Sequence, residues 1–82
     1  MNKDIFVNNN CYTELVFTRV NKKLKTSWDI LIIKYIVNDI LTSNDSDYKL
    51  NGKNWYVSNK NANIELVINK NNYRLITANQ IF

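Results

Sequence analysis

The feature that most constrains the fold is a change in the period of apolar residues at Tyr48. Before Tyr48, apolar side chains recur every three or four positions, which is the spacing of an amphipathic helix. After it, apolar and polar side chains alternate, which is the spacing of a half-buried strand. The 82 residues leave room for one domain. We therefore predict an α+β domain over residues 1–82, in which two helices pack on one face of a three- to four-stranded antiparallel β-meander.

Two helices are expected before Tyr48, preceded at residues 4–8 by either a short leading helix or an extended arm. The first covers residues 11–24, with Asn9 or Asn10 as its N-cap. Its apolar stripe comprises Tyr12, Val16, Phe17, Val20 and Leu24. The second covers residues 28–41 or 28–42, with a capping box of Thr26 and Asp29. We expect the centre of the core to come from its wide stripe of Ile30, Ile32, Ile33, Ile36, Val37 and Ile40.

The residues after Tyr48 predict the meander. Residues 48–50 and 54–58 form a hairpin around Asn51-Gly52, a dipeptide typical of a type I′ turn. Residues 64–69 and 73–78 also alternate, and a tight turn at residues 70–72 joins them.

The residue types on which most catalytic sites depend are missing. The sequence has no histidine, one cysteine and one glycine. It therefore excludes a Ser–His–Asp or Cys–His device, a structural zinc site and a glycine-rich phosphate loop. Asn44, Asp45 and Asp47 do not match a calcium loop, which needs a glycine and a later glutamate. We expect no catalytic residues, no metal site and no cofactor, and we interpret residues 43–47 as a polar loop that ends the second helix.

The sequence also predicts where the protein resides. Residues 1–8 do not resemble a signal peptide. The longest apolar stretch, residues 30–37, contains Lys34 and is far shorter than the roughly 18 residues of a membrane span. We expect a cytoplasmic protein without membrane contact, in which Cys11 is a reduced, buried thiol. Heavy use of Asn, Lys and Ile, whose codons are AT-rich, indicates a low-GC bacterium, or a phage or mobile element within one.

A basic cluster lies at the end of the first predicted helix. The net charge of +4 and the pI near 9.3 weakly favour acidic partners and argue against a DNA mimic built from carboxylates. Arg19, Lys22 and Lys23 share a helical ridge, and Lys25 follows them. This cluster is suited to phosphates or to an acidic protein surface. The alternative is a solvated helix C-terminus, which the helix dipole favours.

Two apolar or aromatic groups offer further candidate surfaces. Trp28, Leu31 and Tyr35 form a second ridge on the second helix, which either packs against the first helix or is exposed to a partner or a second copy.

On the strands, Trp55 and Tyr56 point to opposite faces, so one of them lies on the uncovered face of the sheet. Tyr73 and Arg74 follow on the last strand. Aromatic and arginine side chains on an open sheet face can stack on bases, whereas cross-strand packing is the alternative explanation.

Four segments carry a resemblance along nearly the whole chain: NCYTELV at 10–16, RVNKKL at 19–24, GKNWY at 52–56 and YRLIT at 73–77. In these segments the chain resembles a small uncharacterised family of Firmicute proteins, a domain of unknown function. The resemblance implies a bacterial or mobile-element origin and brings no established activity or functional residues. Small proteins of that setting are often phage or plasmid accessories, including inhibitors of CRISPR and other defence systems.

The order of helices and strands, ending in Tyr73-Arg74-Leu75-Ile76, is also similar to the RelE-like toxins, which are ribosome-dependent ribonucleases. Tyr73 and Arg74 would match the Tyr-Arg strand of that family. A leading strand is not evident, however, and neither a second arginine nor a C-terminal acid–base residue follows.

We therefore expect a non-enzymatic binding protein, an inhibitor or accessory of a protein or ribonucleoprotein partner, with the anti-CRISPR or other anti-defence type included. A nucleic-acid-binding module and a RelE-like toxin ribonuclease are the alternatives. The candidate partner-binding residues are Arg19, Lys22, Lys23, Lys25, Trp28, Leu31, Tyr35, Trp55, Tyr73 and Arg74.

Overall fold

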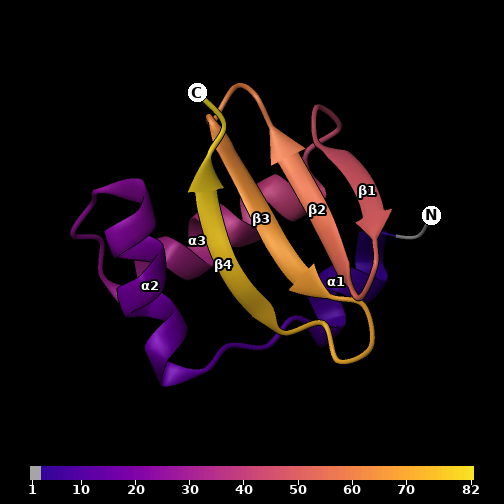
Figure 1. Ribbon diagram of the computed structural model, residues 1–82, viewed down its shortest axis with the longest axis horizontal. Helices are drawn as coiled ribbons and strands as arrows, with labels where there is room; N and C mark the ends of the chain where they lie inside the picture. Colours follow the sequence, from indigo (N-terminus) through magenta and orange to yellow (C-terminus); the bar gives the residue numbers. More distant parts are fainter. Residues whose placement is uncertain (1–2) are drawn as a thin grey trace.

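The computed structural model describes residues 3–82. Three helices precede four strands, in the order α1 (Lys3–Asn9), α2 (Glu14–Leu24), α3 (Ile30–Thr42), β1 (Asp47–Asn51), β2 (Asn54–Asn59), β3 (Ile64–Asn69) and β4 (Leu75–Gln80) (Figure 1). The strands form one antiparallel sheet in the order β1-β2-β3-β4. The predicted α+β class with an antiparallel meander is confirmed. Residues 4–8, for which the sequence allowed either a short helix or an extended arm, belong to the helix α1.

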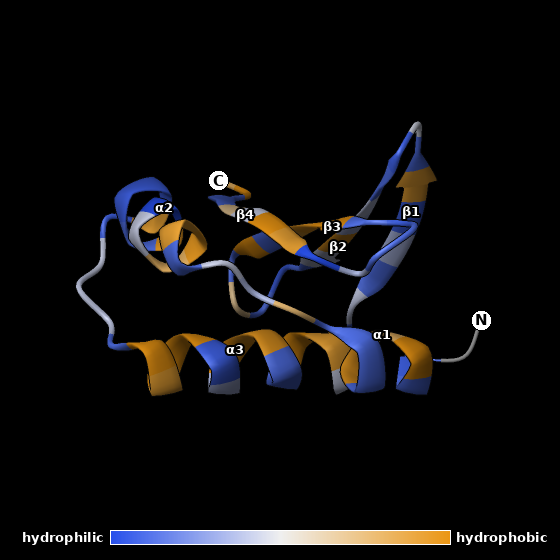
Figure 2. Ribbon diagram, turned by 90° about the horizontal axis from the view of Figure 1, so that it is seen from below, coloured by the Kyte–Doolittle hydropathy of each residue, from blue (hydrophilic) through white to orange (hydrophobic). Residues whose placement is uncertain are grey.

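The helices occupy two different positions around the sheet. Figure 2 shows α3 and α1 in one layer beneath the sheet, whereas α2 lies at the height of the sheet, beside β4. The core fills the space between α3 and the sheet, and α2 adds its buried side chains Val16, Val20 and Leu24 along the β4 edge. No helix within residues 3–82 covers the other face of the sheet (Figure 2). None of these helices is long and apolar enough to cross a membrane.

The first long helix starts three residues later than predicted. Cys11 does not begin α2 but forms a parallel bridge with Arg74, just before β4. Its backbone N–H donates to Tyr73 O, and its carbonyl accepts from Leu75 N. Thr13 is therefore the N-cap, and its side chain makes no capping hydrogen bond. The prediction that Cys11 is buried is wrong, because this extended segment leaves the residue exposed on the sheet edge.

The α2–α3 turn is organised by Asn21 rather than by the predicted capping box. The Oδ1 of Asn21 accepts from the Thr26 hydroxyl at 2.8 Å and from the Trp28 N–H at 3.0 Å, and its Nδ2 donates to Trp28 O at 2.8 Å. The hydroxyl of Thr26 is thus bonded to Asn21 and does not cap α3. Asp29 alone caps the helix, by accepting from Ile32 N.

The apolar stripe predicted for α3 is rotated in the structure. Ile33, Val37 and Ile40 are buried as expected, but Ile30 and Ile32 are each about half exposed. Leu41, which the prediction left out, is fully buried. The helix therefore buries a face that is centred on Ile33, Val37, Ile40 and Leu41, and the side chains of Ile30 and Ile32 lie at its margins.

The first hairpin has a different turn from the predicted one. Asn51 pairs with Asn54, so the loop consists of Gly52 and Lys53. Only Gly52 of these two has a positive φ, at 64°. A positive φ at the first loop position alone is the pattern of a type II′ turn, whereas type I′ requires it at both.

An aromatic cluster fills one end of the core. Phe6 of α1 makes edge contacts with Tyr48, Trp55 and Tyr73, at ring-centre distances of 4.9, 5.6 and 5.4 Å. Such edge-to-face pairs are favourable beyond the apolar area that they bury. The cluster stabilises the short helix α1, because its one buried residue, Phe6, contacts two rings from the sheet and one from the β3–β4 turn.

Tyr48 of this cluster makes the stability of the fold sensitive to alkaline pH. Burial raises its pKa from 10.0 to about 12, and its hydroxyl donates to Leu41 O. Between these two values the tyrosine of the unfolded chain ionises while the folded one stays protonated, so the free energy of unfolding should fall as the pH rises. Burial also raises the pKa of Tyr12, which a hydrogen bond from Asn10 lowers in part. Denaturation followed from pH 9 to 12 should show a shallower decline in Tyr48→Phe than in the wild type, and an equally steep decline would contradict this role of Tyr48.

Candidate functional site

A groove between α2 and β4 brings together residues that are far apart in the sequence. This α2–β4 groove has a volume of about 280 Å³ and is lined by Thr13, Leu15, Val16, Arg19, Arg74, Leu75 and Ile76. Two of the lining residues are arginines, and none is acidic. The groove exists because α2 packs beside β4 (Figure 1), and residues 15–19 of the helix line it together with residues 74–76.

The two arginines of the groove are held differently. Arg19 donates from Nη1 to the backbone carbonyl of Ile76 at 3.2 Å, which directs its guanidinium toward β4. Arg74 is exposed, and within residues 3–82 no hydrogen bond or ion pair engages its guanidinium. An arginine offers five N–H donors, so both side chains retain free donors at the groove.

The lysines of α2 extend this positive charge along the helix. A second hollow of about 590 Å³ is lined by Leu15, Thr18, Arg19, Lys22 and Lys23, and it shares Leu15 and Arg19 with the α2–β4 groove. The two hollows therefore adjoin each other at these side chains. We call the group of Arg19, Lys22, Lys23 and Arg74 the basic surface. Lys25 lies outside it, because it ends α2 in a left-handed conformation with φ of 58° and lines neither hollow.

The predicted ridge on α3 is divided in the structure. Leu31 and Tyr35 are 77% and 74% exposed. Trp28 is instead partly buried and packs against the core, where Asn21 holds its backbone. Leu31 and Tyr35 thus do not pack against the preceding helix, and Trp28 does not belong to an exposed strip with them.

Two candidate residues on the strands face the core. Trp55 and Tyr73 contact Phe6 on the side of the sheet that α1 and α3 cover, so neither is presented to a partner on an open face. Tyr56 is the member of the Trp55–Tyr56 pair that points to the uncovered face, where it is partly buried.

The structure also separates Tyr73 from Arg74. Tyr73 has a positive φ of 58° and ends the β3–β4 turn with its ring against Phe6. Arg74 lies in the α2–β4 groove, and β4 begins only at Leu75. The strand predicted for residues 73–78 is therefore wrong at its start, and the two side chains do not form one site.

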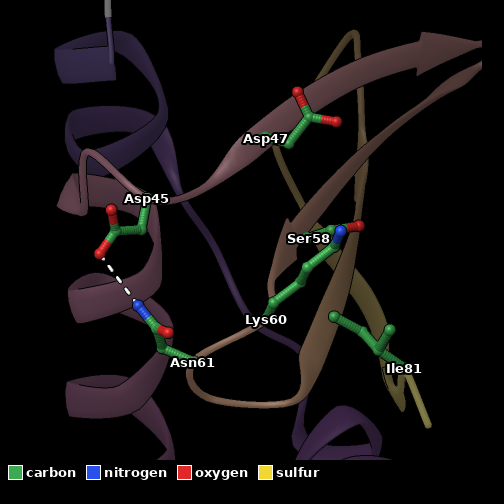
Figure 3. Close-up of a pocket in the computed structure, with 6 residues that line it drawn as sticks. All are labelled: Asp45, Asp47, Ser58, Lys60, Asn61 and Ile81. Carbon is green, nitrogen blue, oxygen red and sulfur yellow. Dashed lines mark hydrogen bonds between the residues drawn. The ribbon is translucent and has the colours of Figure 1, made fainter.

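A further hollow, of about 540 Å³, lies at the other end of the sheet and was not anticipated from the sequence. Its walls are Asp45, Asp47, Ser58, Lys60, Asn61 and Ile81 (Figure 3). Asn61 donates from Nδ2 to a carboxylate oxygen of Asp45 at 3.0 Å, away from Lys60 and Asp47 (Figure 3). The only sequence signal for this hollow was the polar run at residues 43–47. That run gives no indication that the turn at residues 60–61 and the C-terminal end lie close to it.

Acidic and thiol side chains do not assemble into a metal centre in the part of the chain that the structure describes. No group of three or more histidine, cysteine, aspartate or glutamate side chains lies close enough there to hold an ion. The thiol of Cys11 donates to Asn72 O at 3.4 Å.

Fold and site together define a small α+β domain with a basic groove on the flank of its sheet. The sequence belongs to the family described as "protein of unknown function (DUF3781)", which it matches over residues 5–79. This confirms the resemblance to a domain-of-unknown-function family. No curated protein and no solved structure matches the sequence.

Proposed function

We propose that this protein is a non-enzymatic, cytoplasmic binding protein, an inhibitor or accessory that acts on a protein or ribonucleoprotein partner through the basic surface. One observation supports this above all: α2 and the residues at the start of β4 place four cationic side chains around two adjoining hollows whose walls contain no acidic residue. Because like charges repel, gathering them costs stability unless a partner of opposite charge is bound. A low-GC bacterial, phage or plasmid origin, with an anti-defence role such as inhibition of CRISPR, is part of the same proposal.

The proposal is tested by capture of a partner from the lysate of a low-GC bacterium, with and without phage infection. The wild-type protein should retain a defined protein or ribonucleoprotein. A variant with Arg19→Gln, Lys22→Gln and Lys23→Gln should lose it. A control with Lys49→Gln, Lys53→Gln and Lys60→Gln has the same net charge and exposed substitutions, and should retain it. Retention of nothing by the wild type, or equal retention by both variants, would contradict the proposal.

A nucleic-acid-binding module is the second candidate, because the same cations are suited to phosphates. Binding of this kind weakens steeply with salt, since every phosphate contact releases counterions. Absence of a mobility shift at low salt, with both single- and double-stranded probes, would dismiss it.

The toxin alternative receives less support, because Tyr73 packs against Phe6 while Arg74 lies in the groove. A RelE-like ribonuclease should arrest growth when expressed, and Arg74→Ala should relieve the arrest.

A further inference from the structure

We propose that the α2–β4 groove binds a segment of a partner protein that carries both acidic and leucine-like aliphatic side chains. A carboxylate of this segment would lie between Arg19 and Arg74, and an apolar side chain would pack against Leu15. This inference rests on the proposed binding function and specifies the chemistry of the partner.

The charge of the groove indicates an anionic group. Arg19 donates to Ile76 O, which directs its planar guanidinium toward the groove before any ligand arrives. Arg74 has no competing partner within residues 3–82 and supplies a second fork from the opposite wall. Paired guanidinium groups fit the two oxygens of a carboxylate, and charge-assisted hydrogen bonds of this type are among the strongest that side chains make.

The walls of the groove indicate that the ligand is also apolar. Leu15 lies between the two hollows and is 75% exposed, although it sits on the helix that carries the basic surface. Val16, Leu75 and Ile76 complete an aliphatic wall. An apolar side chain of the ligand would pack against this wall and bury Leu15, while a neighbouring carboxylate would bind the arginines. Such an interface has an apolar centre and a charged rim.

The same geometry favours a protein segment over nucleic acid. Single-stranded nucleic acids are usually bound by aromatic side chains on which bases stack, beside a basic track. No aromatic residue lines the α2–β4 groove or the adjoining hollow. The aromatic residues of α2 and its approach, Tyr12 and Phe17, stack on each other at 5.4 Å and pack against the core.

The test uses fluorescence anisotropy with a labelled short peptide of alternating glutamate and leucine. Three comparison probes accompany it: glutamine in place of glutamate, serine in place of leucine, and a single-stranded oligonucleotide. The wild-type protein should bind the glutamate–leucine peptide, and Arg19→Gln and Arg74→Gln should each weaken binding roughly tenfold. Leu15→Ser should also weaken it. Lys60→Gln, which removes a cation at the other end of the sheet, should have no effect.

Equal binding by Arg74→Gln and Lys60→Gln would overturn the inference, as would a glutamine peptide that binds as well as the glutamate peptide or an oligonucleotide that binds more tightly. Arg74→Lys keeps the positive charge but loses the planar set of N–H donors of the guanidinium, so it should bind less well than the wild type. Unfolding curves for each variant confirm that it is folded. If lysate capture depends on the basic surface but the peptide does not bind, this inference fails and the proposed function stands. If the peptide binds but no partner is captured, the proposed function fails.

Discussion

Phe6→Ala is expected to lower the free energy of unfolding by about 3–5 kcal/mol, the usual range for removing a buried aromatic ring. Phe6 is only 3% exposed and contacts Tyr48, Trp55 and Tyr73. The substitution would leave a cavity among these rings and would remove the one buried anchor of α1. For a domain of this size, such a loss is comparable to a large part of the whole stability.

The measurement is urea denaturation followed by tryptophan fluorescence. Ile5→Ala is the matched control, because Ile5 is in the same helix but is 42% exposed. It should lower the free energy of unfolding far less. Similar losses for the two variants would show that α1 is held through its other face rather than through Phe6.

Asn21→Ala is expected to lower the free energy of unfolding by about 2–3 kcal/mol, because it leaves partly buried backbone groups without partners. Its side chain makes three hydrogen bonds, two of them to the backbone of Trp28 and one to the Thr26 hydroxyl. These bonds hold the turn that sets α3 beneath the sheet while α2 stays beside β4 (Figure 2). The N–H and carbonyl of Trp28 lose their partner together, which explains the size of the effect.

Asn21→Asp separates the two halves of this arrangement. The aspartate keeps an acceptor for Thr26 and Trp28 N, but it cannot donate to Trp28 O and sets a negatively charged oxygen against that carbonyl. We therefore expect a loss at least as large as for alanine. Asn44→Ala, in the exposed loop after α3, serves as the control and should change stability little. If Asn21→Ala were no more damaging than Asn44→Ala, the side chain would not organise the turn. Thermal unfolding of the four proteins provides the comparison.

The elements with a strong period were predictable from the sequence. The alternation after Tyr48 yielded the four strands, and the helical period yielded α3 and most of α2. The errors lie where tertiary contacts override local preference. The sequence pattern predicts a helix start at residues 11–13. Cys11 instead forms a parallel bridge with Arg74, and its carbonyl accepts from Leu75 N at the start of β4. The sequence pattern predicts Thr26 as part of a capping box, but its hydroxyl donates to the Asn21 side chain instead.

The candidate site was predictable only in part. The ridge of Arg19, Lys22 and Lys23 follows from helical spacing within one segment, and all three residues line the hollow on α2. Arg74 is separated from Arg19 by 55 positions, so no local pattern could place the two in one groove. Leu15 was not singled out, although its position outside the apolar stripe of α2 was a signal that could have identified it.

What the sequence by itself determined was the class of fold, because each period of apolar residues permits only one kind of element to bury them. Only the tertiary structure decided how the elements meet. Packing of α2 against the edge of β4 created the basic groove, and packing of Phe6 against Trp55 and Tyr73 turned those two aromatics away from any partner. Such contacts depend on side chains that are distant in the sequence and that meet only when the core is closed, so no spacing along the chain encodes them.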